Sequence, residues 1–352
     1  MQTSGNLCIS GCLFFKKQTV QNNKVSIKNF ITPSIPLAIL LVMSCFALWV
    51  ITYFGGHFAT VSMQNNSVVV FLQSILNPNT ILSGLTAIAF TLLNAFLVAQ
   101  LNNRFTLIRS RTFLPIFIFV LLLGVWNETH LVNGSHLALT IFILSLFFTF
   151  NMFHNRNASE EAFMGSFLIS VSSLFINPLI FLIPVFWFGF IMLQSFSLRT
   201  LIASLLGAVT PWILTFSGQY LIYSKIDLAT VFSIQMNLDF DLYTFTLVNS
   251  IYIAAMAIML IICLAGMFSN YSRDAIHTRN KLNFIFLLLI AILILSIVFE
   301  NQFSSFLPII ALLFSFLVSH PFTLKLNNFY GIVFIIFCVL NISFVLIKFI
   351  NI

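Results

Sequence analysis

Long apolar stretches separated by short polar segments run along the chain from residue 33 to residue 350. A membrane-spanning helix needs about 20 apolar residues, with a range of about 17 to 25. Because lipid offers the backbone no hydrogen-bond partner, such a stretch crosses the membrane as a helix. The pattern predicts about eleven spans, at residues 33–54, 80–101, 113–126, 137–153, 162–176, 179–196, 200–223, 245–267, 282–299, 303–319 and 329–349.

The stretches 162–176 and 179–196 are the hardest pair to separate, since together they also fit one broken span. They cover 35 residues and contain Pro178 and Pro184, which is too long for one straight crossing. We interpret them as two spans joined by a tight turn at Asn177 and Pro178.

Lys and Arg side chains accumulate in alternate segments between the spans. Lysine and arginine flanking a span stay on the cytoplasmic side. With the N-terminus in the cytoplasm, thirteen of the 15 cations lie in inner segments, and only Lys225 and Lys348 lie in outer ones. Merging 162–196 into one span reduces this bias to ten against five. The charge pattern therefore predicts a cytoplasmic N-terminus and, after eleven spans, an outer C-terminus.

The composition agrees with a lipid environment, because 60% of the residues are hydrophobic and 7% are charged. A soluble domain averages about 25% charged residues. The fold class predicted is an all-α, polytopic transmembrane helical bundle in the cell inner membrane. The net charge of +7 follows from the cytoplasmic cations, which contact membrane lipids, and we expect no nucleic-acid partner.

The chain divides into a basic cytoplasmic tail at residues 1–30 and a single transmembrane domain at residues 31–352. Two outer loops are long, at 55–79 and 224–244. The first carries apolar residues at helical spacing, which predicts a helix lying on the outer leaflet.

The predicted outer face is acidic and carries histidines, since five of the eight carboxylates fall there. The densest cluster holds Glu128, His130 and His136, and His57 follows two glycines at the end of the first span. We take Glu128, His57 and His136 as candidate catalytic residues, with Glu128 as the base. His130 is a candidate contact for a lipid phosphate or substrate. The alternative is an ordinary polar loop between two spans.

The cluster does not have the spacing of a compact helical metal site, because Glu128 and His130 are two residues apart and His130 and His136 are six apart. We predict no metal ligand and no cofactor. A divalent metal at the acidic outer face stays an open alternative.

Three arginines precede the span at 113–126 on the inner side. Arg104, Arg109 and Arg111 are candidate contacts for a lipid phosphate from the cytoplasm. The alternative is that they serve only to orient the chain in the membrane.

The layout of residues 101–193 resembles the middle of GT-C-type glycosyltransferases, which use polyprenyl-phosphate sugars. A basic inner turn at 104–111 leads to the span 113–126 and a short outer segment at 127–136. The span 137–153, an inner turn at 154–161 and a span from Gly165 to Pro178 follow. The resemblance implies transfer from a polyprenyl-phosphate-linked sugar at the outer face, in a GT-C-like helical arrangement.

Two departures from that class stand out. Gly55, Gly56 and His57 occupy the outer end of the first span, where the class carries a carboxylate base, and residues 55–79 contain no carboxylate. Ser135 and His136 stand where an acidic residue usually precedes the fourth span. Glu128 is the nearby substitute.

The chain also resembles uncharacterised polytopic inner-membrane proteins of Bacteroidota, on residues 151–178 and 196–211. Three functions stay open from the sequence: a GT-C-like glycosyltransferase, a non-catalytic membrane scaffold or assembly factor with a protein partner in the membrane, and a transporter. The absence of an ionisable residue near the centre of any predicted span argues against an ion-coupled transporter.

Overall fold

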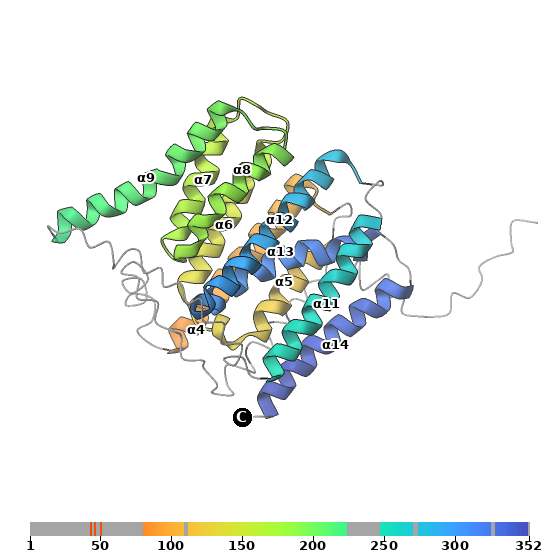
Figure 1. Cartoon of the computed structure of the whole chain (residues 1–352). Coiled ribbons are helices and arrows are strands. Elements are labelled where there is room, and N and C mark those ends of the chain that lie inside the picture. The colour runs from red at the N-terminus through yellow and green to blue at the C-terminus, as the bar shows by residue number, and fades with distance from the viewer. Residues whose placement is uncertain are drawn as a thin grey trace, which may run out of the picture.

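The computed structural model describes residues 80–108, 112–223, 247–269, 274–324 and 328–350, together with Met43, Phe46 and Val50. Those five ranges form ten α-helices and no strand (Figure 1). The α-helices are α4 (Thr80–Phe105), α5 (Leu114–Val125), α6 (Gly134–Asn151), α7 (Ser159–Ser173), α8 (Ile183–Met192), α9 (Leu198–Tyr223), α11 (Leu247–Ser269), α12 (Ile276–Val298), α13 (Phe303–Leu324) and α14 (Asn328–Ile350).

Seven of these helices are long and apolar enough to cross a membrane, namely α4, α6, α9, α11, α12, α13 and α14. The all-α prediction is thus confirmed for the described residues, and the chain has the character of a helical membrane protein. Predicted features that lie outside the described residues are the tail at 1–30 and the loops at 55–79 and 224–244. Of the predicted span 33–54, Met43, Phe46 and Val50 are described, and all three are helical.

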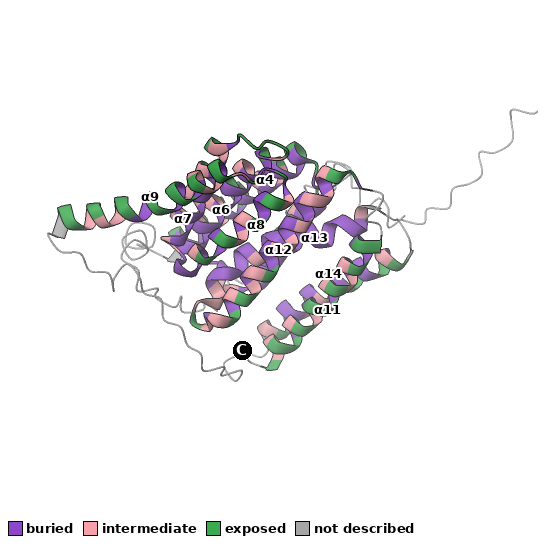
Figure 2. Cartoon of the chain, turned by 45° about the horizontal axis from the view of Figure 1, so that its top comes forward, coloured by how far each residue is buried: buried purple, intermediate pink, exposed green. Residues whose placement is uncertain are grey.

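The helices α5 and α13 lie at the centre of the bundle. Every residue of α5 is apolar, and eleven of its 12 residues are buried. A helix that is apolar on all sides needs neighbours on all sides. The neighbours of α5 include α4, α13 and α14, and α13 packs in addition against α6, α11 and α12. Figure 2 shows α13 buried along its length, whereas α9 projects from the bundle with an exposed outer half (Figures 1 and 2).

Residues 162–196 form two separate helices, α7 and α8, as the division of this stretch predicts. A short 3-10 helix, η2 (Asn177–Leu182), lies between them. The backbone N–H of His154, before α7, donates to the carbonyl of Leu193 at the end of α8 at 3.0 Å. The His154 side chain also contacts Gln194 at 3.1 Å. The end of α8 therefore returns to the level at which α7 begins.

Segments that the charge pattern assigns to the inner side lie together at one end of the bundle. Arg104 in the last turn of α4 contacts Asn151 at the end of α6 at 3.2 Å, and Thr106 contacts His277 of α12 at 3.3 Å. At the opposite end, the hydroxyl of Ser83 in α4 accepts a hydrogen bond from the backbone of Val132 at 3.1 Å. Successive described helices thus run in alternate directions.

Small residues let α7 approach its neighbours closely. A Cβ added at Gly207 of α9 would lie 2.3 Å from the carbonyl oxygen of Phe163 in α7. On the other side of α7, a Cβ at Gly165 would lie 3.0 Å from the Thr149 hydroxyl of α6. Ser170 of α7 donates to the Ala208 carbonyl of α9 at 2.5 Å. Close backbone approach at small residues is a common way for helices to associate in lipid.

We expect Gly207→Ala to destabilise the protein, because its Cβ would overlap a backbone atom that cannot move aside without shifting α7. Overpacking of this kind costs about 1–3 kcal/mol. The measurement is the apparent melting temperature of the purified protein in detergent. Gly218→Ala is the matched control, since it lies on the same helix and a Cβ there meets nothing within 4 Å. Equal melting temperatures for the two variants would contradict the close approach of α7 and α9.

Candidate functional site

The segment between α5 and α6 carries most of the predicted site residues, and it folds by local hydrogen bonds. Trp126 leaves α5 in an extended conformation, and Asn127–Thr129 form a 3-10 turn. The Thr129 hydroxyl donates to the carbonyls of Leu123 at 2.6 Å and Trp126 at 2.7 Å. Asn133 caps α6 by accepting from the backbone N–H of Ser135 at 3.1 Å. The segment is therefore tied to the ends of both helices.

His136 is built into this segment as a buried cross-link. Its side chain is 1% exposed, its Nδ1 lies 3.1 Å from Asn133 Oδ1, and its Nε2 lies 3.1 Å from the Thr129 carbonyl. The Asn94 amide of α4 donates to the His136 carbonyl at 3.5 Å and accepts from the Thr140 hydroxyl at 2.8 Å. Both ring nitrogens thus face oxygens of the fold, and the ring is enclosed by the segment and by α4.

His130 lies beside His136 and is also buried, with 3% of its side chain exposed. Burial lowers the pKa of His130 to about 4, while a hydrogen bond with the Gly124 backbone acts in the opposite direction. Nearby Lys348 and His136 lower the pKa further. At neutral pH this imidazole is therefore uncharged and carries no positive charge for a phosphate.

Glu128 is half-buried at the outer end of the bundle and near a cation. One carboxylate oxygen, Oε2, is buried and has no hydrogen-bond partner among the described residues. The carboxylate acts electrostatically on the Lys348 ammonium of α14. Glu128 is the predicted site residue that keeps an unused buried oxygen.

An aromatic cluster joins α5, α11, α13 and α14 next to Glu128. The Trp126 ring centroid lies 5.9 Å from those of Tyr252 and Phe344, and 6.2 Å from that of Phe303. The Lys348 ammonium lies over the Trp126 ring at 4.8 Å, a cation–π distance. This cluster closes one end of an apolar cavity.

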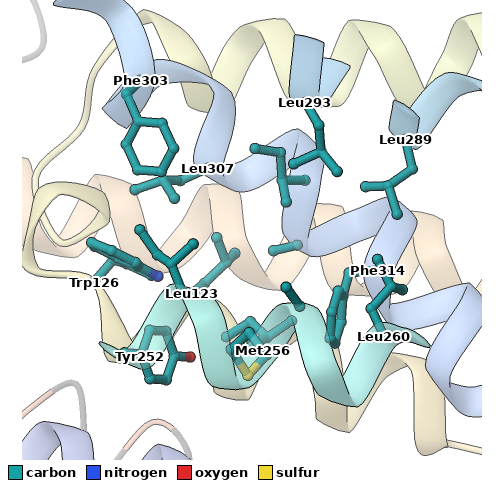
Figure 3. A pocket seen from close by; sticks show the side chains of 15 residues that line it. Leu123, Trp126, Tyr252, Met256, Leu260, Leu289, Leu293, Phe303, Leu307 and Phe314 are labelled. Carbon is teal, nitrogen blue, oxygen red and sulfur yellow. The ribbon is translucent and has the colours of Figure 1, made fainter. Parts of the chain in front are cut away.

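The cavity has a volume of about 160 Å³ and lies between α5, α11, α12 and α13 (Figure 3). Trp126, Tyr252 and Phe303 line one end, and Leu260, Leu289 and Phe314 line the other (Figure 3). None of its lining residues is charged. Glu128, His130 and His136 do not line it, so the predicted cluster and the cavity are neighbours rather than one site.

The predicted inner residues are described only in part. Arg104 is exposed, contacts Asn151 and lies 5.5 Å from the centroid of the Phe105 ring. Arg109, Arg111 and, on the outer side, His57 lie outside the described residues. No group of three or more His, Cys, Asp or Glu residues within the described ranges has the geometry to hold a metal ion.

Sequence reasoning missed a buried pair at the inner end of α13. His320 is 0% exposed, and its Nε2 lies 3.2 Å from Asp274 Oδ2, just before α12. The predicted span 303–319 ends one position before His320, whereas α13 continues to Leu324 through Pro321. The Asp274–His320 pair therefore connects the segment just before α12 to the last part of α13. The sequence signal for this pair is His320 itself, a histidine directly after the apolar run 303–319.

The low pKa of His130 predicts a pH-dependent stability. Between pH 6.5 and about 4 the unfolded chain binds a proton at this histidine that the folded protein does not. The stability contributed by neutral His130 is complete above pH 6.5 and falls as the pH drops toward 4. We expect the apparent melting temperature to fall across this window, and to fall less in His130→Asn. His154→Asn, at an exposed histidine, is the control and should retain the full dependence.

Comparisons with known proteins place the chain at the level of a family. Neither the curated proteins nor the solved structures include a match to it. A family model described as a family of unknown function, DUF6427, matches residues 55–352, which is most of the chain. The chain therefore belongs to the DUF6427 family.

Proposed function

We propose that the protein is a non-catalytic, multi-pass component of the inner membrane of the cell envelope, acting as a scaffold or an assembly factor. The inner membrane is favoured because the described residues form a helical bundle, whereas outer membranes typically hold β-barrels. The bias of Lys and Arg toward alternate segments supports the same location, with the N-terminus in the cytoplasm.

The observation that carries the proposal is the use of His136 within the fold. Both of its ring nitrogens lie 3.1 Å from oxygens of the same segment, and its ring is buried. A general base needs a lone pair that reaches the proton to be removed. Both nitrogens of His136 lie against oxygens of Asn133 and Thr129, so neither faces a space in which a substrate could lie, which supports a role for His136 in holding the start of α6.

The arrangement of the other predicted residues points in the same direction. His130 is buried and neutral, and neither it nor Glu128 lines the cavity. Residues that act on one substrate must converge on one space. Here the polar segment and the apolar cavity are two distinct places. Trp126 lies between them, because it precedes the 3-10 turn of the segment and also lines the cavity.

A second candidate function is the transfer of a sugar from a lipid-linked phosphate at the outer face. One observation favours it: the Glu128 carboxylate and the Lys348 ammonium lie near each other and near the Trp126 end of the cavity. A carboxylate base beside a cation is the pairing that such a transfer requires. Sugar transfer would make the Glu128 carboxylate indispensable for function, whereas the scaffold proposal does not.

A complementation experiment separates the two. In a strain deleted for the gene, we expect Glu128→Gln to restore the wild-type envelope phenotype fully, because the first proposal gives this carboxylate no chemical role. His136→Ala should instead lower the amount of protein in the membrane, because it removes two contacts at the start of α6. The measurements are growth under envelope stress and protein abundance.

The control is the thermal stability of each purified variant. A Glu128→Gln protein that folds like the wild type but fails to complement would reject the scaffold proposal, as would wild-type protein that alone turns over a lipid-linked sugar. A stoichiometric membrane partner retained by both wild type and Glu128→Gln would support it.

A further inference from the structure

We propose that the cavity between α11 and α12 is a lateral binding groove for one acyl chain of an anionic glycerophospholipid, with the phosphate headgroup at Lys348. This inference goes beyond the proposed scaffold role and does not depend on it. It rests on the lining, the opening, and the charge at one end of the cavity.

The lining selects a hydrocarbon. Fifteen residues surround the space, and their polar groups are the Trp126 indole and the Tyr252 hydroxyl, both at the same end. The Tyr252 hydroxyl already donates to Asn341 Oδ1 at 2.8 Å. A dry cavity of about 150 Å³ lined by Leu, Ile and Phe is large enough for benzene. At about 160 Å³, this cavity therefore accommodates a segment of one acyl chain.

The cavity is accessible from the side of the bundle. Ala257 of α11 lines it and is exposed, and Leu293 of α12 lines it and is half-buried. Its floor is formed by buried residues of α5 and α13, such as Leu123 and Leu307 (Figure 3). In a membrane, the exposed rim faces lipid tails, so the chain that enters first belongs to a neighbouring lipid.

The long direction of the cavity matches the orientation of a lipid. Trp126 and Tyr252 lie at one end, and leucines and Phe314 lie at the other (Figure 3). Tryptophan and tyrosine concentrate at the level of the headgroups. A chain lying in the groove thus has its headgroup beside Trp126 and its tail directed toward the middle of the membrane.

The charge at that end selects an anion. Lys348 makes no hydrogen bond or ion pair with any described residue, and its ammonium lies over the rings of Trp126 and Phe344 at 4.8 and 4.9 Å. Lys225 and Lys348 are the two cations predicted on the outer side, and Lys348 is the one that lies within the described ranges. The Glu128 carboxylate acts on this ammonium electrostatically but forms no salt bridge with it, so the three N–H donors of Lys348 remain available to a lipid phosphate at headgroup level.

The test measures lipid retained by the purified protein. Wild-type protein in detergent is mixed with equal amounts of phosphatidylglycerol and phosphatidylcholine with identical acyl chains, and bound lipid is counted by native mass spectrometry. We expect one retained lipid per chain, with phosphatidylglycerol preferred. Ala257→Phe, which fills the groove, should reduce the bound lipid several-fold. Ala254→Phe, on the same helix but outside the lining, is the matched control and should leave it unchanged.

A second pair of variants tests the headgroup end. Lys348→Met should reduce the preference for phosphatidylglycerol by about fivefold, the factor that corresponds to about 1 kcal/mol for one lysine near an anionic headgroup. Lys348→Arg should retain the preference. The groove proposal is overturned if Ala257→Phe binds as much lipid as Ala254→Phe, or if a copurified peptide replaces the lipid. It is also overturned if Lys348→Met leaves the lipid preference unchanged.

Discussion

Hydrocarbon offers no hydrogen bonds, and this constraint accounts for most of the interior of the protein. Many polar side chains inside the bundle bond to a neighbouring helix or to their own backbone. The Thr140 hydroxyl donates to Asn94 across α4 and α6, and the Tyr252 hydroxyl donates to Asn341 across α11 and α14. Ser170 donates to a backbone carbonyl of α9. Such bonds are individually modest, but they set which faces of the helices meet.

The same constraint applies to the buried histidines between α5 and α6. The segment closes the end of two buried helices, so its polar groups must satisfy one another. Thr129 and Asn133 supply the oxygens, and His136 lies between them. Trp126 lines the cavity with its side chain, and its carbonyl accepts a hydrogen bond from Thr129 of the polar segment (Figure 3). One aromatic side chain thus lies between a polar segment, in which Glu128 Oε2 has no hydrogen-bond partner among the described residues, and an apolar space that is open to lipid.

Much of the fold could be predicted from the sequence, because the length and polarity of an apolar stretch decide whether it becomes a helix in lipid. Each predicted span from residue 80 onward corresponds to an α-helix, including the doubtful pair now seen as α7 and α8. The candidate site was predicted less well. Glu128, His130 and His136 do lie close together, but their burial could not be read from spacing. The Asp274–His320 pair was missed because its members are 46 positions apart in the sequence.

What the sequence determined by itself is the helical class, the positions of the described helices and the alternation of their ends, because these depend on local apolar length and on where lysine and arginine fall. The tertiary structure alone decided that α5 and α13 form the centre, that both nitrogens of His136 lie against oxygens of the fold, and that a cavity lies between α11 and α12. These features depend on which helix faces meet. Most of the helices carry apolar residues on all sides and have no strongly one-sided apolar face, so the pattern along the chain does not specify which faces meet.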